Sequence, residues 1–192
     1  MTAPPDDSAP MRAAQVPATP AQGQAQGQVK SQTEAEARMR QAQALLFFAY
    51  RDFTNAADQE LEALGFGRAH HRALHFIGRH PGITVSDLLG ILRITKQALA
   101  RVLHTLVEEG YVAQSPGEVD RRQRLLRLTA KGEALERRLF QRQRDRLAAA
   151  LDSAGPEAER GFRRVMRAIM EDDARQYLNE AYPGWEDAVD GG

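Results

Sequence analysis

The chain has 192 residues, of which 42% are hydrophobic and 27% are charged, and it contains no cysteine. The lack of cysteine excludes a disulfide framework, a thiol nucleophile and a Cys-ligated zinc site. No apolar run approaches the roughly 20 residues that span a bilayer. The N-terminus lacks the apolar core of a signal peptide, so we expect a cytoplasmic protein with no membrane partner.

The net charge is zero, but the charges are unevenly distributed. Between Asp120 and Lys131 there are five basic residues and one acidic residue, whereas from Glu171 onward there are seven acidic residues and one basic residue. A concentrated basic segment indicates a nucleic-acid contact even when an acidic segment elsewhere cancels its charge.

The first part of the chain divides into a tail and a helix. Residues 1–33 hold five of the nine prolines and a Gln-, Ala- and Gly-rich stretch, so we predict that this segment is disordered. From about Glu34, apolar residues recur at steps of three or four, which predicts a helix over 34–66. Gly65 and Gly67 end this helix.

Further helices follow, separated by Gly, Pro and turn residues. A β-hairpin over 111–129, with a Pro-Gly turn, interrupts them. The sequence therefore predicts a mainly α fold with a small β-wing. The predicted helices are 67–79, 84–92, 95–109, 130–151 and 156–178, and an acidic tail covers 179–192.

The order of helix, tight turn, helix and two-stranded ribbon predicts a winged helix-turn-helix over 67–130. Its recognition helix, 95–109, begins at the capping residue Thr95 and carries Lys96 and Gln97 in its first turn. Lys suits guanine and Gln suits adenine in the major groove. Arg101, one turn further on, is placed for a phosphate. Alternatively, these residues form the solvated face of an ordinary helix. The predicted core face consists of Leu99, Val102, Leu103, Leu106 and Val107.

The predicted hairpin tip has the sequence Asp120-Arg121-Arg122-Gln123-Arg124. A guanidinium group fits a narrow minor groove, where the negative potential is enhanced. We expect Asp120 to orient Arg122 through an ion pair. The alternative is a loop that only adds solubility, but the combination with a recognition helix favours DNA binding.

Several short motifs in this region resemble the DNA-binding domain of the MarR family of bacterial regulators. The segment 67–77, together with Thr95-Lys96-Gln97, is similar to the PetP-like branch of that family. The matching motifs are Thr84-Val85-x-Asp87-Leu88-Leu89, Thr95, Leu106-x-x-x-Gly110-Tyr111-Val112, Asp120-x-Arg122, Leu128-Thr129 and Gly132.

The resemblance implies a homodimer in which the helices of 34–66 and 131–178 interlock. Long helices with apolar stripes also need a partner surface in their own right. Two recognition helices then reach successive major grooves of a pseudo-palindromic operator in duplex DNA. Members of the family usually repress transcription, and many release DNA when a small, often phenolic, ligand binds between the dimer helices and the winged domain. The peroxide-sensing branch is excluded because its cysteine is missing.

Five residues are candidates for such a ligand pocket: Tyr50, Phe53, His71, His75 and Phe76. Aromatic residues at helical spacing also occur as plain core, so both interpretations stand. His71 and His75 are four residues apart, as metal-binding pairs are, and His70 and Asp58 lie within reach as further ligands. We favour histidines at the edge of the core, and we predict neither a metal nor a cofactor.

No catalytic set of residues emerges, so an enzyme is not predicted. The alternative to a DNA-binding regulator is a winged-helix module whose basic wing binds an acidic protein.

Overall fold

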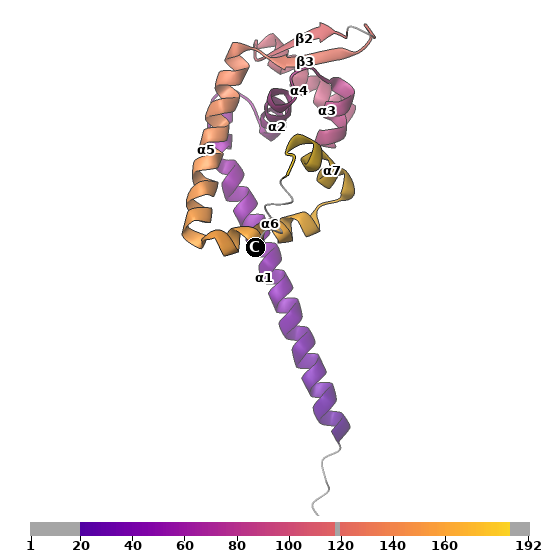
Figure 1. Ribbon diagram of the computed structural model, residues 1–192, viewed down its shortest axis with the longest axis vertical. Helices are drawn as coiled ribbons and strands as arrows, with labels where there is room; N and C mark the ends of the chain where they lie inside the picture. The colour runs from indigo at the N-terminus through magenta and orange to yellow at the C-terminus, as the bar shows by residue number, and fades with distance from the viewer. Residues whose placement is uncertain (1–19, 118–119, 185–192) are drawn as a thin grey trace, which may run out of the picture. The chain divides into compact units, whose positions relative to one another are not determined.

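The structure is a computed structural model that describes residues 20–117 and 120–184. The chain divides into two units, residues 1–48 and 49–192. The described part of the first unit is helical, and the second unit holds the remaining helices and a small sheet (Figure 1). The elements are α1 (Pro20–Glu62), α2 (Arg68–Arg79), β1 (Ile83–Thr84), α3 (Val85–Leu92), α4 (Lys96–Glu108), β2 (Val112–Pro116), β3 (Arg124–Leu128), α5 (Ala130–Ala154), α6 (Pro156–Ile169) and α7 (Asp172–Ala181).

The first helix begins earlier than the sequence predicts, at Pro20 instead of about Glu34. Residues 20–33, which we assigned to a disordered tail, are therefore helical, while residues 1–19 lie outside the described residues. Proline is favoured at the first position of a helix. Alanine and glutamine have high helix propensity, so this segment can form a helix although it offers no apolar face. Composition alone does not reveal this.

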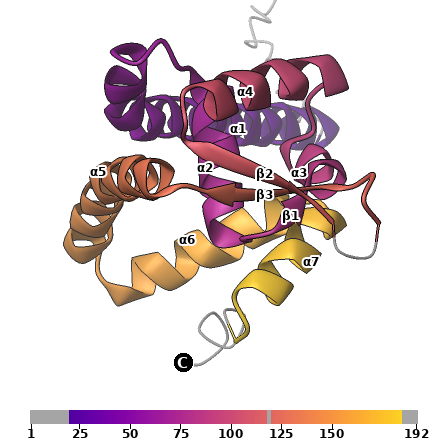
Figure 2. The same cartoon turned by 90° about the horizontal axis from the view of Figure 1, so that it is seen from above.

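The wing belongs to a three-stranded antiparallel sheet in the order β1-β3-β2. β2 and β3 form the predicted hairpin, with Val112 opposite Leu128, and β1 adds Ile83 opposite Leu126. Figure 2 shows α4 on the β2 side of this sheet. The sequence predicted only two strands, because a strand of two residues is too short to show an alternating pattern.

Two threonine caps define the helix-turn-helix. The Thr84 hydroxyl accepts a hydrogen bond from the Asp87 amide at 3.1 Å and begins α3. The Thr95 hydroxyl accepts from the Ala98 amide at 3.2 Å and begins α4. Each cap satisfies a backbone donor that the helix itself leaves unpaired. Between them, Arg93 ends α3 with a left-handed backbone, φ 49° and ψ 45°.

The predicted core face of α4 is largely confirmed. Leu99, Val102, Leu103 and Leu106 are buried, and they pack against α2 and the sheet. Val107 is not part of this face, because 37% of its surface is exposed. It follows Leu106 directly, and one residue turns a helix by about 100°, which moves the side chain off the core face.

The end of the wing and the start of α5 form one tightly packed joint. The Thr129 hydroxyl caps α5 by accepting from the Gly132 amide at 3.1 Å, and it donates to the Gly110 carbonyl at 2.7 Å. The Thr129 amide donates to the Tyr111 carbonyl at 3.0 Å. Lys131 lies with its Nζ 4.1 Å from the centre of the buried Tyr111 ring. The wing and α5 are therefore held together by both backbone and side chains.

The last predicted helix, 156–178, is wrong as a single element. α6 ends at Ile169, Met170 has an extended backbone with φ −68° and ψ 146°, and α7 begins at Asp172. The carboxylates of Asp172 and Asp173 stand in the first turn of α7, where the helix dipole favours negative charge. These carboxylates stabilise a helix that begins at this point, and apolar periodicity alone does not reveal such a start.

One side of α6 is exposed and apolar. α6 has no buried residue, and Phe162, Val165 and Ile169 are 45%, 55% and 60% exposed along one side of it. Phe140 and Leu147 are exposed on α5. Within the described ranges, no helix combines the length and the apolar character that crossing a membrane requires.

Candidate nucleic-acid interface

The first turn of α4 presents the predicted polar side chains to solvent. Lys96, Gln97 and Arg101 are all exposed, on the side opposite the buried leucines. Among the residues that the structure describes, none offers these side chains a hydrogen bond or an ion pair. The helix N-terminus that Thr95 caps adds a partial positive charge at the same place. This turn can therefore receive base edges and phosphate without first breaking an internal contact.

Backbone hydrogen bonds join the described residues of the wing tip. The Gly117 amide donates to the Gln123 carbonyl, and the Gln123 amide donates to the Asp120 carbonyl, both at 3.0 Å. A Cβ on Gly117 would lie only 2.6 Å from the Asp120 carbonyl oxygen, so the turn requires glycine there. The part of the tip at residues 118–119 lies outside the described residues.

Asp120 supports the wing differently from our prediction of an ion pair with the Arg122 side chain. Its Oδ1 accepts a hydrogen bond from the backbone amide of Arg122 at 2.9 Å. An aspartate often accepts from the amide two residues ahead, which fixes a turn. Asp120 thus shapes the backbone that carries Arg122 and leaves the guanidinium group available.

The basic residues of the wing divide into two groups. Arg121, Arg122 and Arg124 are exposed at or next to the tip, and no described residue pairs with their side chains. Lys131, by contrast, donates its Nζ to the Glu109 carbonyl at 2.6 Å and belongs to the joint below the wing. Arg127, near the other end of β3, likewise lies at the base of the wing, with its guanidinium group beside Gly82. Three of the five basic residues between Asp120 and Lys131 are therefore positioned for an external anion.

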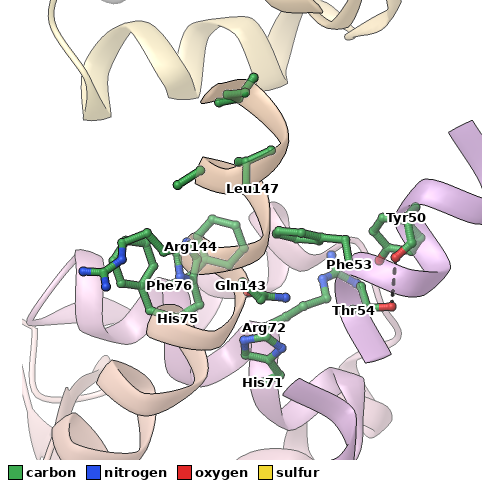
Figure 3. Close-up of a pocket in the computed structure, with 13 residues that line it drawn as sticks. Tyr50, Phe53, Thr54, His71, Arg72, His75, Phe76, Gln143, Arg144 and Leu147 are labelled. Atoms are coloured by element: carbon green, nitrogen blue, oxygen red, sulfur yellow. Dashed lines mark hydrogen bonds between the residues drawn. The ribbon is translucent and has the colours of Figure 1, made fainter. Parts of the chain in front are cut away.

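A cavity of about 540 Å³ lies between the last turns of α1, α2 and α5, all within the second unit. Figure 3 shows that all five predicted pocket residues line it, with Tyr50 and Phe53 on α1 and His71, His75 and Phe76 on α2. The sequence analysis does not predict the cavity wall formed by α5, because the α5 residues are far along the chain from α1 and α2. That wall consists of Phe140, Gln143, Arg144, Leu147, Ala148 and Leu151, and Thr54 and Arg72 complete the lining.

Several titratable groups lie near His71. Burial, together with the charge of His75, lowers the pKa of His71. The His75 Nδ1 lies 3.5 Å from the Glu136 Oε1. Asp58 binds Arg68 through its Oδ2 at 2.9 Å, while its buried Oδ1 has no hydrogen-bond partner. No three acidic or histidine side chains in the described segments converge as metal ligands would, so the metal alternative gains no support.

The lowered pKa of His71 predicts a pH effect on stability. The unfolded chain binds a proton near the ordinary histidine pKa of about 6.5, whereas the folded chain binds it only at lower pH. The stabilising contribution of neutral His71 is therefore complete above pH 6.5 and falls as the pH drops through that value. We expect His71→Gln to flatten the pH dependence of the free energy of unfolding between pH 7 and pH 5, measured by urea denaturation. An equally steep dependence in the variant would refute this assignment.

Comparison with known proteins places these features in one family. The MarR family model matches residues 64–123, which contain α2, α3, α4 and β2. The HTH-type transcriptional regulator PetP of Rhodobacter capsulatus is 48% identical over 140 residues, which cover 73% of this chain and 84% of PetP. The regulator BilQ of Clostridium symbiosum is 30% identical over 82 residues, which cover 43% of this chain and 57% of BilQ.

Solved structures of transcription regulators share this fold. A SlyA-like transcription regulator from Listeria monocytogenes superposes with a TM-score of 0.59 at 19% identity, over 72% of this chain and 92% of that protein. A mutant of MarR from E. coli, solved in complex with operator DNA, superposes with a TM-score of 0.56 at 22% identity, over 67% of this chain and 92% of MarR.

Proposed function

Because the chain belongs to the MarR family of DNA-binding transcription regulators, we propose that it acts as a homodimeric repressor of a pseudo-palindromic operator. Members of this family are regulators and not enzymes. The observation that carries the proposal is the pair of unpaired basic surfaces, one on the first turn of α4 and one on the wing. α4 packs beside β2, so both surfaces belong to one unit.

Each surface suits a different groove of the DNA. An α-helix fits the major groove, where Lys96 and Gln97 reach base edges and Arg101 reaches a phosphate. The arginines of the wing tip suit the narrower minor groove, where the potential is more negative. Phosphate contacts make the affinity for DNA fall steeply with salt. A preferred DNA sequence distinguishes sequence-specific DNA binding from general attraction to an acidic protein.

An exposed apolar stripe on α6 supports the dimer. Phe162, Val165 and Ile169 form a stripe that a second copy can cover, and contiguous apolar surface of this kind marks interaction sites. Two copies related by a two-fold axis place their recognition helices one helical turn of DNA apart, about 34 Å. The operator then contains two inverted half-sites.

The cavity supports a regulatory ligand of small aromatic character. Its walls include the rings of Phe53, Phe76 and Phe140, while His71 and Arg144 offer polar contacts. A volume of about 540 Å³ falls within the range of small-molecule sites. The cavity lies between α2 of the winged domain and α5, which leads into α6 with its proposed dimer stripe, so an occupant can change the relative position of α2 and α5.

Selection from a random DNA library with the purified protein tests the operator and the dimer together. We expect enrichment of inverted half-sites with centres about 10 base pairs apart. Single half-sites would contradict the dimer, and no enrichment over bulk DNA would contradict sequence-specific binding. Repeating the selection with small aromatic compounds tests the ligand, which we expect to reduce recovery of the enriched sites.

Gln97 is expected to determine sequence preference more than overall affinity. A bidentate amide contact to a base discriminates against the wrong base by about 1–3 kcal/mol. Gln97→Ala removes this contact but no charge, so binding to the selected operator falls while binding to random duplex stays unchanged. Titration of both duplexes by fluorescence anisotropy measures the difference. An equal loss on the two duplexes would place Gln97 on the phosphate backbone instead.

A further inference from the structure

The turn of the helix-turn-helix contains an arginine in an unfavourable backbone conformation. Arg93 is the only residue other than glycine that has a positive φ in the described parts of the chain. The left-handed conformation crowds a Cβ atom, and glycine adopts it without this cost. The turn alone therefore favours glycine, so the reason for an arginine lies in its side chain.

The Arg93 side chain binds the acidic start of α7. Its Nη1 donates to the Glu171 Oε2 at 2.7 Å, and its Nη2 donates to Asp173. The two carboxylates are 78 and 80 residues away along the chain. Two charge-assisted hydrogen bonds from one guanidinium group resemble the way in which arginine binds a phosphate.

α7 is anchored independently of these ion pairs. The Tyr177 hydroxyl lies 2.8 Å from the His80 Nε2, and its ring packs edge-on against Phe76 with centroids 5.6 Å apart. At the other end, Arg175 donates to the Met170 carbonyl at 2.6 Å and closes the α6–α7 junction. The position of Glu171 and Asp173 is thus set by the fold, and Arg93 is not needed to dock the helix.

Arg93 lies beside the proposed DNA-binding turn of α4. It stands two residues before Thr95, directly ahead of the turn that presents Lys96, and 58% of its side chain is exposed. Phosphates near this turn require the same guanidinium donors that Glu171 and Asp173 occupy. The two carboxylates also place negative charge beside a surface that approaches a polyanion.

We propose that the acidic start of α7 competes with DNA phosphates for Arg93 and thereby lowers the affinity of the protein for duplex DNA. The contact is autoinhibitory, and it acts equally on all sequences because phosphates carry no sequence information. DNA binding releases Arg93 from the carboxylates, so removing the carboxylates makes that release unnecessary.

The test uses the full chain and a fluorescein-labelled duplex of mixed sequence, titrated at several salt concentrations. The variant Glu171→Gln/Asp173→Asn should bind about two- to fivefold more tightly at low salt, as expected for the loss of exposed ion pairs. Its plot of log affinity against log salt should become steeper by about one unit, because the parent's freed carboxylates regain a counterion when Arg93 leaves them, which offsets the one released from the phosphate, and the variant lacks these carboxylates.

Two matched variants isolate the contact. Asp152→Asn/Glu157→Gln removes two exposed carboxylates that pair with no described residue and leaves both partners of Arg93, so we expect unchanged affinity. Arg93→Gly keeps the left-handed turn and removes the guanidinium group. In its background, Glu171→Gln/Asp173→Asn should no longer steepen the salt dependence, which a double-mutant cycle measures. Thermal unfolding verifies that each variant is folded.

Two outcomes would overturn the proposal. Weaker binding by folded Glu171→Gln/Asp173→Asn would mean that α7 holds the turn in its reading position. Equal tightening by Asp152→Asn/Glu157→Gln would mean that only total charge matters. The proposal rests on α4 and the wing facing DNA, and Arg122→Ala in the same titration tests that premise separately.

Discussion

Replacing Gly132 with alanine is expected to destabilise the protein by about 3 kcal/mol, as steric overpacking at a fixed site does. A Cβ on Gly132 falls 2.1 Å from the carbonyl oxygen of Tyr111, far inside van der Waals contact. That oxygen cannot withdraw freely, because it accepts a hydrogen bond from the Thr129 amide at 3.0 Å. The clash therefore separates the start of α5 from the base of the wing. Urea denaturation followed by circular dichroism measures the loss.

Gly90→Ala is the matched control for this experiment. Gly90 lies inside α3, and a Cβ placed there meets nothing within 4 Å. Alanine in an unobstructed helix position is favoured over glycine by about 0.5–1 kcal/mol, so this variant should be slightly more stable than the parent. If Gly132→Ala also retained full stability, the close approach between α5 and Tyr111 would not be part of the fold.

The second large effect is expected at the wing, where Arg122→Ala should weaken operator binding by about 1–3 kcal/mol. The Arg122 guanidinium is exposed and its backbone is fixed by the Asp120 carboxylate at 2.9 Å. A pre-positioned arginine loses little entropy when it enters the minor groove. Anisotropy titration with the selected operator measures the loss, and the salt slope should fall by about one unit.

Arg137→Ala removes the same charge from an exposed position on α5, away from the wing, and should leave the affinity nearly unchanged. A comparable loss in both variants would mean that the effect of Arg122 comes from net charge alone. An unchanged affinity in Arg122→Ala would contradict its place at the minor groove.

The parts of the fold that the sequence predicts well are those with local signals. Thr84, Thr95 and Thr129 each precede a helix, and each caps it through a backbone amide three residues ahead. The hairpin is likewise predictable, because turn residues and alternation lie close together in the chain. The five pocket residues were found because aromatic and histidine side chains repeat at helical spacing on α1 and α2.

The features that the sequence does not reveal depend on contacts between distant segments. The sequence around Arg93 does not indicate its pairing with Glu171 and Asp173, because that contact requires the complete arrangement of α2, α6 and α7. The α5 wall of the cavity is hidden for the same reason. The Asp120 carboxylate binds the Arg122 backbone amide and not the predicted guanidinium group. Residue spacing alone does not distinguish between these two partners.

The joint between the wing and α5 couples them, so that they move together as one rigid body. α5 has 25 residues, so at 1.5 Å per residue it is about 37 Å long. Because Thr129 is bonded to both Gly110 and Gly132, a rotation of about 5° around the far end of α5 carries the wing through roughly 3 Å. That displacement is close to the spacing of about 3.4 Å between successive nucleotides. A small rotation at the junction of α5 and α6 therefore shifts the wing by almost one nucleotide step relative to the DNA.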